Sequence, residues 1–332
     1  MATTFKTLTN NDVTSTRTLL HEAIPITGTI VSGTYTADSN VKDYSHGIFQ
    51  SVYDYPYLSS SANHIFDVTV GYSSNSSLSS SSNIQNSKKI NVYNQMAQVL
   101  VGYDSTGNIQ DFDEDGNFAA GGTKIREAIF INFARLLTKD EIKKQSLTFT
   151  VYTSGAATPH VTVPLTVGDY GAATEYKVNS PAGEYGILYT TTGKTTKCGL
   201  LYYQAGVAVL TGSLFTSYTS PFGFGNGVAT AEPFNAVLTG SAITASANGF
   251  RNRIDNIQFN NTTELNSTIY FCRANHNDFN YSSNPTYLSS SKIQVKNSSM
   301  DSPVSYITTV GLYSSDNELL AVAKLSEPIK KT

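Results

Sequence analysis

The residues best suited to chemistry form an acidic run, DFDEDG, which begins at Asp111. Carboxylates at positions 1, 3 and 5 and glycine at position 6 match the start of an EF-hand calcium loop. The match ends at position 12, where Gly122 stands in place of the bidentate glutamate. We therefore predict an acidic turn that closes a hairpin and no metal site. The alternative is a calcium loop of another type, held by Asp111, Asp113 and Asp115.

The histidines and cysteines do not have the spacing of a metal site. No pair of them follows a zinc pattern. Cys272 and His276 are four residues apart, on an expected strand that leads into a loop, and a cysteine on a strand is usually a small apolar residue. We predict no cofactor and free thiols. The residues concerned are His21, His46, His64, His160, His276, Cys198 and Cys272.

Motifs of nucleophilic catalysis and nucleotide binding are also absent from the sequence. There is no G-x-S-x-G elbow, no P-loop and no Ser/His/Asp set in a recognisable context. The glycines of 223–227 lack the strand-then-helix setting of a phosphate cradle. The separation of glycosidase carboxylates depends on the fold and is not readable here. We predict no catalytic residue and a protein that is not an enzyme.

The elements that would position any site are mostly strands. Alternating β-branched and aromatic residues, bounded by turn residues, are typical of β-strands. The fold class is therefore predicted as mainly β (α+β), with antiparallel sheets or a sandwich and one or two short helices in the N-terminal half. Strands are expected at 26–35, 64–72, 124–135, 146–153, 161–167, 185–191, 199–204, 207–215, 255–259, 268–274 and 293–295.

Three segments favour helix. Apolar spacing predicts a helix from Ser87, as its N-cap, to Gly102, which suits the C′ position. The sequence from Thr138 to Glu141 matches a capping box and predicts a short helix to about residue 144. A short helix is also possible over 12–22. A helix over 124–137 is the alternative to the strand expected there.

The last 31 residues contain a predicted β-hairpin. Residues 304–313 alternate as a strand, 314–317 have turn chemistry, and 319–325 return. The returning strand carries apolar residues on both faces, and such strands are usually buried on both faces. We therefore expect the hairpin to be central to a core.

Composition narrows the class of protein. Only 14% of the 332 residues are charged and the net charge is −3, while Ser, Thr and Asn are abundant. A polar, weakly charged surface suits a chain covered by neighbours, since burying a charge costs more than burying a hydrogen-bonded hydroxyl. No basic run indicates nucleic acid, and no 18-residue apolar segment indicates a membrane. The 21 tyrosines and lack of tryptophan suit interfaces and weaken a sugar-binding interpretation.

Three segments resemble virion structural proteins of contractile-tailed bacteriophages, especially those that infect marine cyanobacteria. They are YDYPYLSSSANHIFDVTVGYS from Tyr53, GLLYYQAGVAVLTGSLF from Gly199 and YFCRANHNDFNYSSNPTYLSSSKI from Tyr270. None is a chemical signature. The resemblance implies a particle component and no particular site.

We therefore expect a structural component of a tailed-phage virion, made in the host cytoplasm, that acts through protein–protein assembly. The tail or baseplate is the first placing, and the capsid or neck is the alternative. The alternative of another class is a receptor-binding or glycan-processing tail protein. Expected partners are copies of the chain, as a homo-oligomer, and other virion proteins, without nucleic acid or membrane. The expected parts are an N-terminal arm (1–45), an α+β region (46–155) and a mainly β region (156–332) with a long loop at 217–249.

Overall fold

The computed structural model describes residues 5–25, 38–118, 121–153, 164–215, 234–275 and 305–331, with 278–279, 288–289 and 292–293. The chain forms two compact units. The smaller contains Met1–Thr18 and Leu265–Thr332, and the larger contains Leu19–Glu264. The boundaries of these units, at 18/19 and 264/265, differ from those between the three parts expected from the sequence. The division into 1–45, 46–155 and 156–332 stays a prediction.

A 12-stranded sheet dominates the described chain, so the mainly β fold is confirmed. Ten neighbouring pairs, including β14 with β8, are antiparallel. The hydrogen bonds Ser15–Thr268 and His21–Thr262 run in opposite senses along β1 and β14, as antiparallel strands require. In spatial order the strands are β1 (Val13–Pro25), β14 (Ile254–Tyr270), β9 (Thr148–Tyr152), β10 (Pro164–Gly168), β11 (Tyr185–Tyr189), β12 (Lys197–Tyr202), β13 (Val207–Thr211), β7 (Glu127–Phe133), β4 (His64–Tyr72), β3 (Gln50–Tyr53) and β2 (Val41–Asp43), with β8 (Glu141–Ile142) beside β14.

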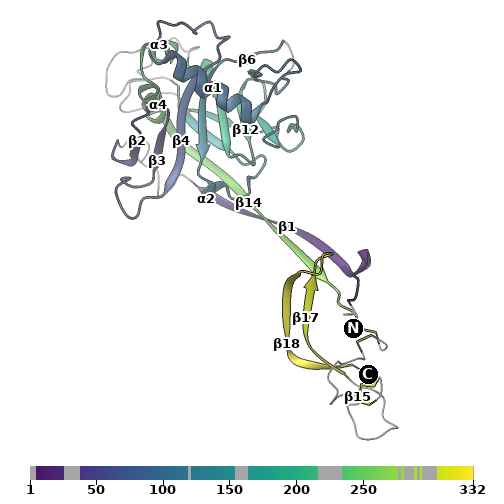
Figure 1. Cartoon of the computed structure of the whole chain (residues 1–332). Coiled ribbons are helices and arrows are strands. Elements are labelled where there is room, and N and C mark those ends of the chain that lie inside the picture. The colour runs from purple at the N-terminus through teal and green to yellow at the C-terminus, as the bar shows by residue number, and fades with distance from the viewer. Residues whose placement is uncertain are drawn as a thin grey trace. The chain divides into compact units, whose positions relative to one another are not determined.

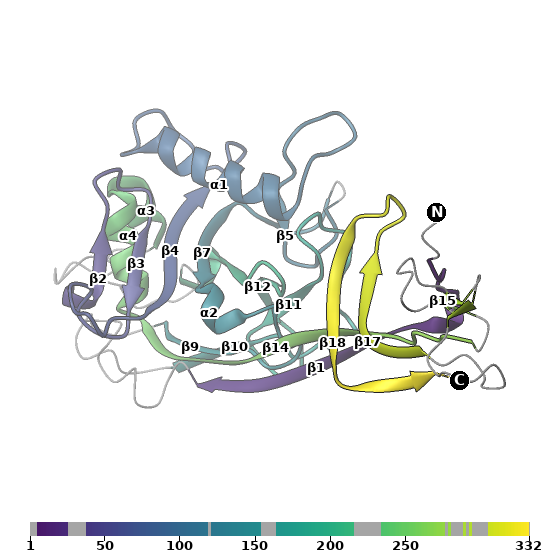
Figure 2. The ribbon, with the colours of Figure 1, turned by 60° about the horizontal axis from the view of Figure 1, so that its bottom comes forward.

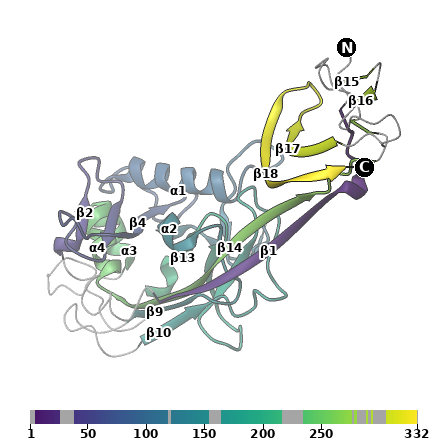
Figure 3. The same cartoon turned by 90° about the horizontal axis from the view of Figure 1, so that it is seen from below.

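Helices pack on the sheet of the larger unit. The helix α1 (Asn86–Leu100) lies on β4, and Gly71 permits this close approach, because a Cβ there would come within 2.6 Å of the Lys89 carbonyl oxygen. The helices α3 (Phe234–Gly240) and α4 (Ile243–Arg251) contact each other, and α4 contacts β4 (Figure 1). Figure 3 shows α1, α3 and α4 from below. The shorter helical segments are α2 (Arg135–Thr138), η1 (Asn10–Asp12), η2 (Asp38–Asn40) and η3 (Gly212–Phe215).

The strand predicted at 64–72 and the helix predicted at 87–102 are confirmed, apart from the helix start. The helix begins at Asn86, and its N-cap is Gln85, which has a φ of 55° and makes no side-chain cap. Ser87 is therefore not the cap. At the other end Gly102 has a φ of 91°, and its N–H donates to the Ala97 carbonyl at 2.9 Å, as expected for a C′ glycine.

The helix expected from the capping box is wrong. Thr138 is the last residue of α2, and Lys139 follows with a φ of 52°. Residues 141–142 then form β8, which pairs with Asn261 and Thr262 of β14. The sheet thus satisfies backbone groups that a helix would have satisfied internally. The possible helix at 12–22 is wrong for the same reason, since 13–25 form β1.

The long loop expected at 217–249 is wrong over the part that the structure describes. Residues 234–240 and 243–251 are the helices α3 and α4. Phe234, Val237 and Leu238 follow a helical spacing and are buried. Residues 216–233 lie outside the described residues. The strands expected separately at 255–259 and 268–274 are one strand, β14, which ends at Tyr270.

The smaller unit contains the predicted C-terminal hairpin, of β17 (Ser305–Tyr313) and β18 (Leu319–Lys331). Ile307 pairs with Ile329 and Thr309 pairs with Lys324, so one residue of β17 stands opposite four of β18, and the hairpin bends there (Figure 2). The expectation that it lies buried between two layers is wrong, because Leu320 is 68% exposed. The two strands form a sheet of their own. Two further short strands, β15 (Leu288–Ser289) and β16 (Lys292–Ile293), pair with each other.

Candidate functional site

The acidic run lies on a short hairpin, as predicted. The strands β5 (Phe112–Asp113) and β6 (Lys124–Ile125) pair in antiparallel fashion. The Phe112 ring is buried, with its centroid 5.5 Å from Tyr93 and 5.7 Å from Phe130. The Tyr93 hydroxyl donates to the Ile125 carbonyl at 2.7 Å and accepts from the Phe112 N–H at 3.1 Å. Aromatic packing and this hydroxyl fix both strands against α1.

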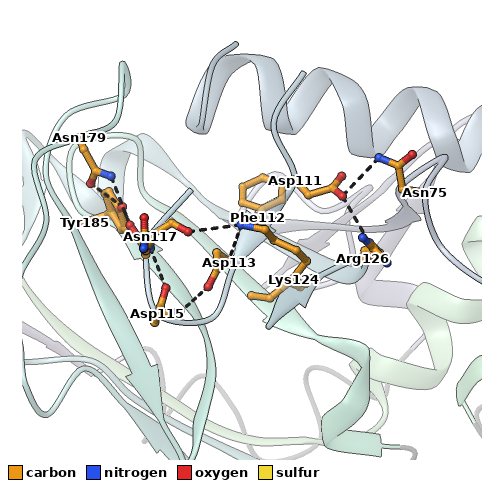
Figure 4. A network of polar contacts seen from close by, with 12 residues as sticks. Asn75, Asp111, Phe112, Asp113, Asp115, Asn117, Lys124, Arg126, Asn179 and Tyr185 are labelled. Atoms are coloured by element: carbon orange, nitrogen blue, oxygen red, sulfur yellow. Dashed lines mark hydrogen bonds and ion pairs between the residues drawn. The ribbon is translucent and has the colours of Figure 1, made fainter. Parts of the chain in front are cut away.

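Asp111 points away from the other two aspartates, toward the segment that follows β4. Its carboxylate accepts from Ser73 Oγ at 2.6 Å. It also accepts from Arg126 Nε at 3.4 Å (Figure 4). The Asn75 side-chain amide lies 3.5 Å from Asp111 Oδ2, the same oxygen that accepts from Arg126. These contacts join the hairpin to the end of β4 and leave Asp111 outside any common site with Asp113.

Asp113 is fully buried and has a cation of its own. The Lys124 ammonium lies 2.7 Å from Asp113 Oδ2. Gly122, at position 12 of the calcium motif, has a φ of 70°, and a Cβ there would come within 2.6 Å of the same oxygen. A glutamate at 122 would therefore collide with the carboxylate that it should assist. This geometry does not fit the EF-hand arrangement.

The turn itself is held by Tyr185 and Asn179. The Tyr185 hydroxyl donates to the Gly116 carbonyl at 3.0 Å, and the Asn179 amide reaches the same oxygen at 3.2 Å (Figure 4). Asp115 Oδ1 accepts from the Asn117 N–H at 2.8 Å. The Gly116 carbonyl oxygen and Asp115 Oδ1 are thus engaged within the protein. Over the described residues, no three His, Cys, Asp or Glu side chains gather as a metal-holding group.

The electrostatics of the turn follow from its burial. Burial raises the pKa of Asp113 and that of Glu114. Side-chain hydrogen bonding with Asp113 lowers the pKa of Asp115. The two aspartates therefore differ in proton affinity: the buried one holds a proton more readily and the outer one stays ionised. The Asp113 carboxylate is paired with the Lys124 ammonium of the same hairpin, so the turn is stabilised by an ion pair within the chain.

We expect Asp113→Asn to lower the melting temperature by the same amount with and without Ca²⁺, because Lys124 already neutralises this carboxylate. Lys124→Met should cost more, about 3 kcal/mol, since it leaves a buried carboxylate unpaired, whereas the substitution at Asp113 leaves an ammonium that can turn to water. Scanning calorimetry with 5 to 10 equivalents (roughly) of Ca²⁺ or with chelator checks both. Tight calcium binding that disappears in Asp113→Asn would contradict the prediction.

The structure brings together a Ser, His and Asp that sequence motifs did not indicate. On β3 and β4, Asp67 Oδ1 accepts from Ser51 Oγ at 2.5 Å and lies 2.8 Å from His64 Nε2. The carboxylate stands between serine and imidazole. In a nucleophilic triad the imidazole stands between the other two and takes the serine proton. This order does not activate Ser51, and pairing across adjacent strands, which a linear motif does not encode, explains why the group was missed.

The remaining candidates are dispersed. His21 Nδ1 lies 3.0 Å from Thr262 Oγ1, and His46 Nδ1 accepts from the Ile48 N–H at 3.0 Å. Both cysteines are free: Cys198 is buried, whereas Cys272 is exposed. His160, His276 and the glycine-rich 223–227 lie outside the described residues, so the Cys272–His276 pair stays untested.

A buried lysine was not predicted. Lys89 of α1 is fully buried, and its ammonium donates to the carbonyl oxygens of Ile84 at 2.7 Å, Leu238 at 2.5 Å and Ser241 at 2.6 Å. Burial lowers the pKa of Lys89 to about 8. Three carbonyl acceptors use all three ammonium protons, so this lysine fastens α1 to the C-terminal end of α3. Its role is structural.

No protein-family model, curated protein or solved structure matches this chain. In the described part of the chain, no helix combines the length and apolarity needed to span a bilayer.

Proposed function

We propose that this protein is a structural component of a tailed-phage particle and acts by protein–protein assembly rather than by catalysis. We propose the tail or baseplate as its location in the particle, with the capsid or neck as the second choice. The resemblance of three segments to such proteins supports the class. The weakly charged composition supports a chain whose surfaces are covered by neighbours.

The observation that carries the proposal is the exposed apolar surface of the β17–β18 hairpin. Leu319, Leu320 and Val322 of β18 are 53%, 68% and 58% exposed. A two-stranded hairpin is at best marginally stable alone in water, and contiguous apolar surface marks interaction sites. Assembly would bury this surface and would stabilise the hairpin at the same time.

The test is the composition of the particle. Particles of a phage whose genome encodes this chain should be purified on a gradient. Quantitative mass spectrometry should then find the chain in them at a fixed stoichiometry. Antibody against the purified chain should label one place on the particle in electron micrographs. Absence of the chain from purified particles would overturn the proposal, whereas labelling of the head would favour the second placing.

Receptor binding is the second candidate function, because partly exposed aromatic and polar groups meet at the start of β4. The Tyr53 ring lies 5.5 Å from His64 and 6.5 Å from Tyr57, which is 38% exposed. An aromatic face beside a carboxylate such as Asp67 suits a polar ligand with apolar ring faces, such as a glycan. Host-cell adsorption that is lost in Tyr57→Ala and retained in Tyr55→Ala would favour this function over assembly.

A further inference from the structure

We propose that Lys124 and Asp113 condense in the folded chain to an isopeptide bond, an amide between the lysine Nζ and the aspartate Cγ. The bond would join the two strands of the acidic hairpin covalently, since Asp113 of β5 and Lys124 of β6 are cross-strand partners. The inference does not depend on the proposed assembly function. It concerns a modification that the chain carries out on itself.

The two reacting groups are already in contact. Lys124 Nζ lies 2.7 Å from Asp113 Oδ2, and Oδ2 is bonded to Cγ, the atom that the amine would attack. A nucleophile held against its target has lost most of its translational and rotational freedom before the reaction begins, which lowers the barrier. The pairing of β5 with β6 fixes both backbones and limits how far the two side chains can separate.

The direction of this contact is unusual for an ion pair. In three other lysine–carboxylate pairs of the chain the ammonium donates a hydrogen bond to the carboxylate: Lys6 to Asp278, Lys144 to Glu184 and Lys194 to Glu175. Asp113 Oδ2 is buried, yet it accepts no hydrogen bond from the described residues. The Lys124 nitrogen therefore lies against the carboxyl group without the alignment of a hydrogen bond.

Burial favours the reactive forms of both groups. The Asp113 side chain is fully buried and that of Lys124 is 16% exposed. Removal of charges from water is unfavourable, and burial raises the pKa of Asp113. Transfer of one proton from the ammonium to Oδ2 gives an uncharged acid beside a neutral amine, the nucleophilic form of lysine. The product amide is uncharged as well, and the exclusion of water protects it from hydrolysis.

The reaction balances with the atoms of these two side chains. After the first proton has moved to Oδ2, the electron pair of Nζ attacks Cγ. Negative charge develops on Oδ1, where the Asp115 N–H already donates a hydrogen bond at 3.0 Å. Nζ then gives a second proton to Oδ2, the bond from Cγ to Oδ2 breaks, and Oδ2 leaves as water with both protons. No oxidant, reductant or co-reactant is needed.

Mass spectrometry of the full chain tests this directly. The unaltered protein, folded and then denatured for measurement, should be lighter than its sequence by one molecule of water. Trypsin should not cleave after Lys124, because an acylated lysine is not a substrate, and residues 90–126 should appear as one peptide that also lacks one water. Fragmentation of this peptide should release no ions from single breaks between 113 and 124, since the closed loop holds both pieces together.

Lys124→Arg is the matched variant, because it keeps a cation beside Asp113 and has no primary amine. Its mass should equal that of its sequence, and circular dichroism should show it folded. Lys194 is the control within the chain: its ammonium lies 2.6 Å from Glu175, but the two side chains are 36% and 46% exposed. Trypsin should cleave after Lys194, since water solvates that pair and keeps both groups charged.

Loss of water has a second chemical source in the same peptide, a succinimide at Asp115–Gly116. A succinimide needs no lysine, leaves trypsin free to cleave after Lys124, and allows fragment ions from within the loop. A folded, unaltered chain of full mass that is cleaved after Lys124 would overturn the inference, and so would an equal loss of water in Lys124→Arg. Either result would leave the proposed function standing, because that function is tested by the presence of the chain in particles.

Discussion

Asp169→Ala should lower the free energy of unfolding by about 3–5 kcal/mol, because it removes the acceptor of three hydrogen bonds and a buried donor left unsatisfied costs about 1–3 kcal/mol. Asp169 follows β10 and is 1% exposed. Its carboxylate accepts from the Gln145 N–H at 2.7 Å, the Leu147 N–H at 3.0 Å and the Tyr203 hydroxyl at 3.0 Å. Alanine would leave the buried Leu147 N–H and Tyr203 hydroxyl and the part-buried Gln145 N–H without their acceptor, and each buried donor left unpaired is costly.

Gln145 makes this carboxylate harder to replace. It has a φ of 61°, a strained region for a residue other than glycine, and the bond from its N–H to Asp169 holds the turn just before β9. Asp169→Asn keeps the shape and one oxygen, so it should cost about half as much. Urea unfolding of the three proteins measures these differences.

Asp104 provides the matched control. Its carboxylate also accepts three hydrogen bonds, from the Thr106 N–H and hydroxyl and from the Asn108 N–H, but in an exposed turn. Water can replace the lost acceptor there, so Asp104→Ala should cost much less than Asp169→Ala. Equal losses of stability at both positions would mean that Asp169 does not join the end of β10 to the start of β9.

Predictions from sequence succeeded where local pattern and tertiary environment agree. Residues 64–72 alternate and lie inside the sheet, between β7 and β3, and the structure makes them β4 with the predicted bounds. Gly102 ends α1 because only a residue tolerant of positive φ fits there. In both cases a short stretch of chain contains the whole physical reason.

Predictions failed where a distant partner decides. Residues 138–144 match a helix start, yet β14, more than 110 residues away, pairs with β8 instead. The apolar residues of β18 indicated burial, but burial needs covering layers, and a sequence does not show whether these come from the same chain. The Ser51–Asp67–His64 group depends on the register of β3 and β4. By contrast, the loop expected over 217–249 was a local error. The apolar residues of α3 follow a helical spacing, Phe234, Val237 and Leu238, but the small and polar residues around them favoured a loop.

Raising the pH from 8 to 11 should destabilise the protein strongly, because it ionises tyrosines whose side chains are fully buried, among them Tyr93, Tyr185, Tyr202 and Tyr203. Burial raises the pKa of each of these four above its ordinary value near 10. An acid whose pKa is raised by folding contributes stability that is fully present below the unfolded pKa and is lost as the pH rises toward the folded pKa. Each tyrosine therefore costs about 1.4 kcal/mol per pH unit above 10.

Other buried groups modify this loss without reversing it. Burial also raises the pKa of Cys198, whose contribution is lost above pH 8.5 or so. Lys89 and Arg253 act in the opposite sense, because burial lowers their pKa values to about 8 and about 10, and bases with lowered pKa values gain stability as the pH rises. The gain from Lys89 roughly offsets the loss from Cys198. A net loss of about 4 kcal/mol remains at pH 11, a large part of the ~5–15 kcal/mol that stabilises a typical domain.

Tyr202→Phe separates the tyrosine effect from general alkaline damage. Among the described residues, the buried Tyr202 hydroxyl has no hydrogen-bond partner. Its removal should therefore stabilise the protein by about 1 kcal/mol at pH 8 and reduce the loss above pH 10 by about 1.4 kcal/mol per unit. Tyr55→Phe, at a residue that is 57% exposed, should change neither quantity. Urea unfolding midpoints at intervals from pH 8 to 11 measure both slopes. A stability that stays level to pH 11, or equal slopes for Tyr202→Phe and the unaltered chain, would show that water reaches these hydroxyls and that the sheet between β11 and β13 is not a dry core.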